Sequence, residues 1–251
     1  MNWKQTLFWS FSAAAIFYYF LLFGVFVFVG QEEMQLFIPE WWYIREFLFQ
    51  PGGFCAVAGQ WIIQYYRQPM SAVVFHTVLL VGCGFMVYRI LRCFSDKTYL
   101  LFLSLLPVLY LVKMSIHGEY LVDGTVGVVL MLLALSVSLK VRRAGSIAGY
   151  GIASTLFLCG LTGLLSVCYA FLYTLLALLR YKTSRQRLAA SACLIPALFI
   201  YLFSGWLGIP VPLSDGWMPE AYLEIQRLPH YYMYRVWTFF TLSIVGVALF
   251  R

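Results

Sequence analysis

Two adjacent carboxylates, Glu32 and Glu33, follow the first long apolar run of the chain, which ends at Gly30. Acids in this position are either solvated residues that flank a membrane span or members of an active site. In an active site such a carboxylate would take a proton from a reacting hydroxyl. Flanking residues are the more frequent case, so the choice depends on what surrounds the two acids.

A second group of titratable side chains occupies the segment "KMSIHGEYLVDG", residues 113–124. His117, Glu119 and Asp123 form the only compact mix of titratable residue types in the sequence. A polar connector between two spans explains this composition, and a functional site built from these titratable side chains is the alternative.

Basic side chains that suit phosphate binding lie in the segments before and after these acids. Arg67 belongs to the first long polar segment, and Arg227, His230 and Arg235 belong to "RLPHYYMYR", residues 227–235. Arginine clamps phosphate through its planar fork of donors, although contact with lipid headgroups gives the same pattern. His76 falls inside an apolar run, where a hydrogen bond between helices is its expected role.

Composition restricts the class of protein that carries these residues. Of the 251 residues, 63% are hydrophobic and 11% are charged, against about 25% charged in soluble domains. We therefore predict an all-α, polytopic membrane protein of one domain over residues 1–251. We expect the basic residues behind the net charge of +7 to keep the loops that carry them in the cytoplasm. We do not expect them to bind nucleic acid. The six cysteines contain no C-x-x-C pair, so neither a disulfide framework nor a zinc site is expected.

Apolar runs of near-spanning length recur along the whole chain. We expect about eight spans, over 6–30, 71–94, 99–114, 125–140, 146–160, 163–181, 188–209 and 235–250. The fifth and sixth are separated only by "CGLTG", so they form either a tight hairpin or a re-entrant half-span.

Charge supports one orientation of this bundle. With the N-terminus and the C-terminus in the cytoplasm, 12 of 17 basic residues lie inside and 9 of 10 acids lie outside. The Lys/Arg bias sets the orientation, and the acids indicate that the outer loops are built around carboxylates. We expect the bacterial inner membrane as the location and membrane lipids as contacts.

The first outer loop, residues 31–70, has the pattern of two short helices. Phe37, Trp41, Ile44 and Leu48 share one helical face after Pro39, and "QPGG" (residues 50–53) marks a turn. In the next segment, one face is expected to carry Phe54, Val57, Trp61, Ile62 and Tyr65. We predict two amphipathic helices on the outer membrane surface.

The layout of this loop resembles that of the GT-C class of membrane glycosyltransferases. "QEEMQLF" and "REFLFQPGGF" also resemble an uncharacterised bacterial multi-pass family, a domain of unknown function. GT-C enzymes transfer a sugar from a polyprenyl-phosphate carrier, with an acid of the first outer loop as base or as ligand to a divalent metal.

The resemblance implies roles for particular residues. Glu32 or Glu33 would be the catalytic acid, Glu119 a second acid, and the phosphate contacts would be Arg67, His117, Arg227, His230 and Arg235. The donor would be a polyprenyl-phosphate sugar. A non-enzymatic membrane scaffold or a truncated, inactive family member is the alternative, and a transporter is third because the span centres hold almost no charge.

Overall fold

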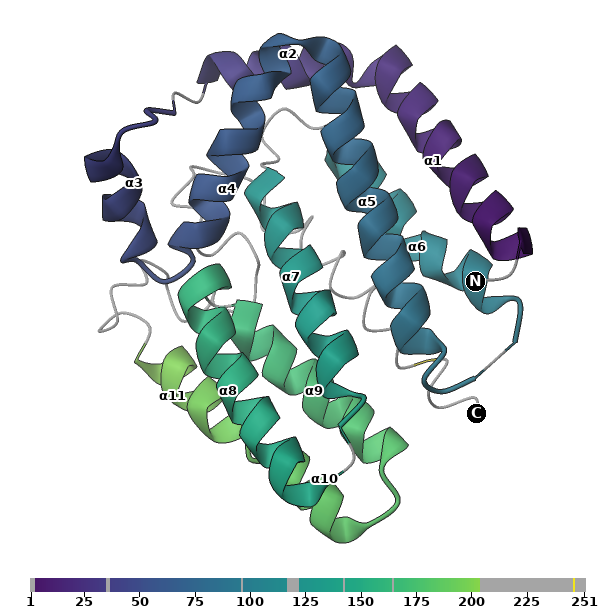
Figure 1. Cartoon of the computed structure of the whole chain (residues 1–251), viewed down its shortest axis with the longest axis vertical. Helices are drawn as coiled ribbons and strands as arrows, with labels where there is room; N and C mark the ends of the chain where they lie inside the picture. Colours follow the sequence, from purple (N-terminus) through teal and green to yellow (C-terminus); the bar gives the residue numbers. More distant parts are fainter. Residues whose placement is uncertain are drawn as a thin grey trace.

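Regular structure in the described part of the chain is helical throughout. The computed structural model describes residues 3–34, 37–95, 97–116, 122–141, 143–163, 165–203 and 246, without the side chains of residues 33 and 34. Figure 1 shows the helices in chain order. They are α1 (Trp3–Phe23), α2 (Val25–Met34), α3 (Trp41–Leu48), α4 (Gly53–Ile63), the 3₁₀ helix η1 (Gln64–Arg67), α5 (Pro69–Leu91), α6 (Leu100–Met114), α7 (Val122–Ser138), α8 (Ala144–Thr162), α9 (Leu165–Arg180), α10 (Ser184–Ser191) and α11 (Leu194–Leu202).

Three of these helices, α1, α5 and α8, are long and apolar enough to cross a membrane. The helices α6, α7 and α9 are apolar but shorter. The prediction of an all-helical chain is confirmed for the described residues, and eight spans are not confirmed.

Two of the expected spans are interrupted in their described parts. The first, over 6–30, is divided at Gly24, and Figure 1 shows α2 turned away from the axis of α1. The Phe28 ring packs on this glycine, since a Cβ there would lie 2.9 Å from Phe28 Cε2. The span over 188–209 is divided into α10 and α11, because the residues of α10 are mostly polar or small and the apolar run begins only at Leu194.

The helix α5 lies at the centre of one half of the bundle, where it contacts α1, α2, α6 and α7. The helices α8 and α9 pack against each other as a tight hairpin, which is one of the two predicted arrangements. The hairpin turns at Gly163, whose φ is 60°, and the Tyr173 hydroxyl donates to the Ile147 carbonyl across it at 3.5 Å. Between the halves, α4 packs on α7 and α8.

The two short helices expected in the first polar segment are present as α3 and α4, joined by the predicted turn. Gly52 has a φ of 87°, which only glycine adopts readily. A Cβ at Gly53 would lie 1.7 Å from the Phe47 carbonyl oxygen. Tyr43 on α3 then donates to the Gln60 side-chain oxygen on α4 at 3.1 Å.

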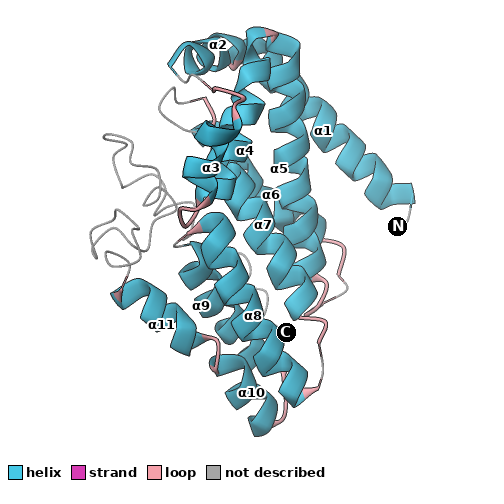
Figure 2. Cartoon of the chain, turned by 60° about the vertical axis from the view of Figure 1, so that its left-hand side comes forward, coloured by secondary structure: helices cyan, strands magenta, loops and turns pink. Residues whose placement is uncertain are grey.

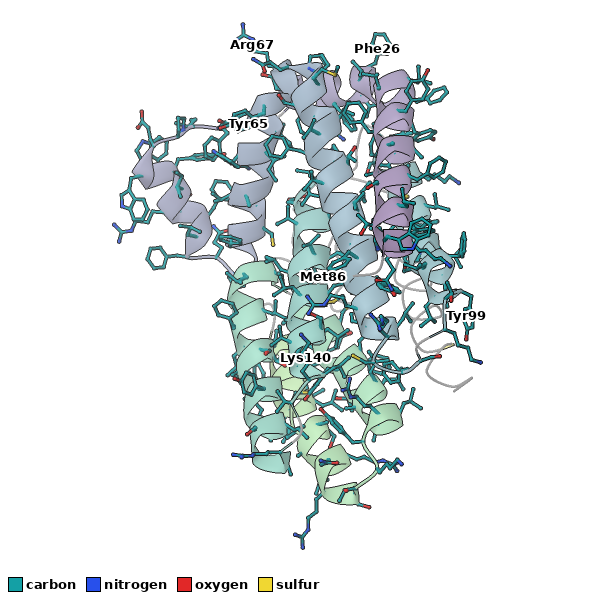
Figure 3. The ribbon with its side chains drawn as sticks, turned by 45° about the vertical axis from the view of Figure 1, so that its right-hand side comes forward. Phe26, Tyr65, Arg67, Met86, Tyr99 and Lys140 are labelled. Carbon is teal, nitrogen blue, oxygen red and sulfur yellow. The ribbon has the colours of Figure 1, made fainter. Side chains whose placement is uncertain are left out.

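Charged side chains separate along the bundle. Basic residues gather where α5, α7 and α9 end and where α1, α6, α8 and α10 begin. We call this the basic end, and its members are Lys4, Arg89, Arg92, Lys97, Lys140, Arg143, Arg180, Lys182, Arg185 and Arg187. The other end carries α2 and η1, and we call it the Arg67 end. Figure 3 shows Arg67 and Lys140 far apart along the bundle.

Candidate functional site

The candidate site lies at the Arg67 end, where α2, η1 and the first turns of α5 meet. The helix α2 is apolar up to Gly30 and then carries Gln31 and Glu32. Gln31 is buried and Glu32 is half-buried. The first of the predicted acids therefore sits at the edge of the packed helices rather than on a free loop.

A buried stack of rings lies beneath this edge. His76 of α5 and Tyr66 of η1 share a hydrogen bond of 2.6 Å between Nε2 and Oη. The Phe28 ring of α2 stacks on the imidazole at 4.3 Å with an interplanar angle of 9°. All three side chains are fully buried. The stack fixes the last turns of α2 against the start of α5, and with them the position of Glu32.

The His76 imidazole uses only one of its ring nitrogens in this arrangement. Within the described residues, Nδ1 is buried and has no hydrogen-bond partner. The role expected for His76, a hydrogen bond between helices, is the one it has through Nε2. Because buried polar atoms are nearly always paired, Nδ1 marks a polar position inside an otherwise apolar layer.

Arg67 is the last residue of η1 and its side chain is exposed. Among the described residues it forms no ion pair, so no carboxylate fixes the position of its side chain. Gln68 and Pro69 follow it, and Pro69 begins α5 with the fixed φ that suits a first helical residue. Its element η1 contacts α2, which carries Glu32, and the exposed guanidinium keeps its donors available to a ligand.

Asp123 forms a second polar position, in the first turn of α7 ahead of the span predicted over 125–140. It is buried against α4, where a Cβ added at Gly59 would lie 2.5 Å from the Asp123 Cβ. Its carboxylate accepts the Gly124 N–H at 2.9 Å. Burial raises the pKa of Asp123 from 3.8 to about 7, and the pKa of the neighbouring Cys55 thiol is raised by burial and then by the Asp123 charge.

The helix α4 buries a stripe that the sequence pattern did not predict. Cys55, Gly59, Ile62 and Ile63 are buried, whereas Phe54, Trp61 and Tyr65 from the predicted face are exposed. Small residues at Cys55 and Gly59 let the α4 and α7 backbones approach closely, as in helix packing within membranes. The bulky face is left on the outside, and Trp41 and Trp42 of α3 are exposed as well.

A comparison with models of protein families shows which family the chain belongs to. The model of a family of unknown function, DUF6057, matches residues 1–251. The chain belongs to this family. The comparisons with curated proteins and with solved structures gave no match. The prediction of an uncharacterised family is therefore confirmed, and the likeness to GT-C enzymes stays a prediction.

The structure of this family member brings only part of the predicted site together. Glu32 and Arg67 come to the same end on two elements that contact each other. Glu33 lies in α2, and its side chain is outside the described residues. The remaining predicted residues also lie outside them, namely His117, Glu119, Arg227, His230 and Arg235.

Two features of the site were missed from the sequence. Tyr66 precedes His76 by ten residues, but Tyr66 lies in a 3₁₀ turn that follows no periodic pattern, so no signal in the sequence indicated their pairing. The Cys55 and Gly59 spacing of four residues was a usable signal for close packing. Within the described ranges, no three His, Cys, Asp or Glu side chains could hold a metal ion.

Proposed function

We propose that the chain is a membrane-embedded enzyme that acts on a lipid-linked sugar phosphate at the outer face of a bacterial inner membrane, in the manner of GT-C glycosyltransferases. The observation that carries this proposal is the order α1–α2, α3, α4–η1 and α5, with Glu32 and Arg67 at one end on touching elements. A carboxylate and an arginine in this relation suit an acceptor hydroxyl and a carrier phosphate respectively.

The proposed chemistry assigns one task to each group. Glu32 or Glu33 takes the proton of the acceptor hydroxyl as that oxygen forms its bond to the sugar carbon. The bond between the sugar carbon and the carrier phosphate breaks, and its electron pair leaves with the phosphate. Arg67 contacts that phosphate and stabilises the charge it gains. The exposed rings of α3 and α4 would lie against the lipid that carries the sugar.

The test replaces the acids in the full chain. Glu32→Gln and Glu33→Gln, singly and together, are expected to lower transfer by roughly 100-fold or more, the range for loss of a general base. Envelope glycan profiles and accumulated lipid-linked sugar report the effect. Glu46→Gln on α3 removes the same charge from an exposed position and is the matched control. Unchanged profiles in the Glu32 and Glu33 double variant would refute the proposal.

A membrane scaffold is the second candidate, and one observation favours it. The outer faces of α1 and α11 expose bulky side chains, among them Phe11, Tyr18, Ile195 and Phe199. Partner helices cover such faces as well as lipid does. A partner that co-purifies in detergent and is lost on Phe11→Ala and Phe199→Ala, together with unaffected glycans in the acid variants, would select this function.

A further inference from the structure

An open depression lies at the basic end, away from Glu32 and Arg67. It is lined by Leu178 of α9 and by Ser184, Arg185, Arg187, Leu188 and Ser191 of α10, and encloses about 450 Å³. Figure 2 shows α10 beside the ends of α8 and α9 at this end of the bundle. Two guanidinium groups, two hydroxyls and two aliphatic side chains thus meet in one hollow, and none of the described residues that line it is an acid.

The helical spacing explains why these side chains share the hollow. Ser184, Arg187, Leu188 and Ser191 are three or four residues apart and form one face of α10. The Arg187 Nε donates to the Tyr181 carbonyl oxygen at 2.8 Å. This bond fixes the Arg187 side chain and leaves its two terminal nitrogens as donors, beside the exposed Arg185.

Exposed apolar side chains are also present on α10 and on α11, the next helix along the chain. Leu188 is 75% exposed, and Leu194, Ile195 and Leu198 of α11 are also exposed. The described acids, Glu32, Glu40, Glu46 and Asp123, lie on α2, on or next to α3, and in the first turn of α7. A ligand that matches this surface combines a negative head group with an attached hydrocarbon tail, and in a membrane an anionic lipid supplies both.

We infer that this depression binds the phosphate head group of an anionic phospholipid, with Arg185 and Arg187 on the phosphate and Leu178 and Leu188 on the acyl chain. The inference shares with the proposed function only the placement of the chain in a membrane. It concerns the opposite end of the molecule and requires no activity of Glu32. The Ser184 hydroxyl adds an uncharged contact, whereas the Ser191 hydroxyl donates to the Leu188 carbonyl oxygen at 2.8 Å.

The experiment measures lipid retained by the purified full chain in detergent. Native mass spectrometry is used to titrate phosphatidylglycerol and, separately, phosphatidylcholine. The expected result is at least about tenfold tighter binding of phosphatidylglycerol. Arg185→Gln is expected to weaken it by about fivefold, the usual effect of one basic residue near an anionic surface. Leu188→Glu, which places a negative charge on an exposed position, is expected to weaken it further.

Lys97→Gln is the matched control, because it removes one charge at the basic end outside the depression. It is expected to change binding less than twofold. Equal losses in Lys97→Gln and Arg185→Gln would reduce the effect to general charge and overturn the inference. Equal binding of the two lipids, or displacement of phosphatidylglycerol by inorganic phosphate alone, would overturn it as well. Loss of lipid binding with glycan transfer intact leaves the proposed function standing.

Discussion

The carboxyl groups of Glu32 and Asp123 sit in opposite surroundings. Glu32 is half-buried at the end of α2, where water or a substrate can reach it. Asp123 is 6% exposed and packs on Gly59 of α4. At the scale of single residues, the first suits proton transfer to and from a ligand. The second suits a role in which the protonation state is coupled to the packing of α4 on α7.

Asp123 is expected to make the stability of the fold depend on pH. Because burial raises its pKa in the folded chain from 3.8 to about 7, the folded state binds its proton more tightly than the unfolded state does. The folded state is therefore most stable below about pH 4 with respect to this group, and this contribution is lost as the pH rises towards 7. At about 1.4 kcal/mol for each pKa unit, the effect amounts to at most about 4 kcal/mol.

Thermal unfolding of the purified chain in detergent at pH 5 and pH 8 measures this dependence. Asp123→Asn keeps the size of the side chain and removes its titration, so the difference in Tm between the two pH values should shrink. Glu46→Gln removes an exposed carboxylate and should leave that difference unchanged. If the Tm of the Asp123→Asn variant falls between pH 5 and pH 8 by as much as that of the wild-type chain, Asp123 is not the titrating group.

At the scale of elements, the sequence predicted where the chain turns, but it did not predict which face of each helix is buried. Gln50–Gly53 marked the turn between α3 and α4 because its glycines meet backbone requirements that are local. The buried stripe of α4 was missed because an apolar helix inside an apolar bundle gives no polar face to orient it. The division at Gly24 was missed for the same reason, since the fit of the Phe28 ring on a glycine depends on where that ring packs.

The contact between α4 and α7 gives a prediction at this scale. Gly59→Ala adds a Cβ that would lie 2.5 Å from the Asp123 Cβ and 2.9 Å from its Cα. Both are fixed atoms, so the helices must separate, and overpacking of this kind typically costs about 1–3 kcal/mol. A fall in Tm of several degrees is expected in a detergent melt.

Gly82 and Gly149 supply the controls for that substitution. Both are helical, and a Cβ at either position meets nothing within 4 Å. Their replacement by alanine should leave Tm equal or slightly higher, because alanine favours helix by up to about 1 kcal/mol. A Gly59→Ala chain as stable as these two would show that α4 and α7 are not in close contact.

At the scale of the whole molecule, the separation of charge is the property that the sequence predicted best. Lys/Arg bias is a sum over many residues, so errors of a few residues in each boundary do not change it. The candidate site depends instead on which few side chains meet. Tyr66 and His76 meet because Tyr66 lies in the 3₁₀ turn η1 that leads into α5, and that turn carries no periodic signal.

The same charge separation predicts which end of the bundle faces outward. Glu46→Cys on α3 should react with a membrane-impermeant maleimide added to intact cells, whereas Lys97→Cys at the basic end should react only after the membrane is opened. Both positions are exposed. Cys55, Cys83, Cys168 and Cys193 are buried, so their background labelling should be low. Cys93 and Cys159 are partly exposed and are replaced by serine in the parent chain.

Labelling of Lys97→Cys alone in intact cells would invert the orientation and move Glu32 and Arg67 to the cytoplasmic side. Equal labelling of both positions in intact cells would show that the chain does not separate its two ends across a membrane.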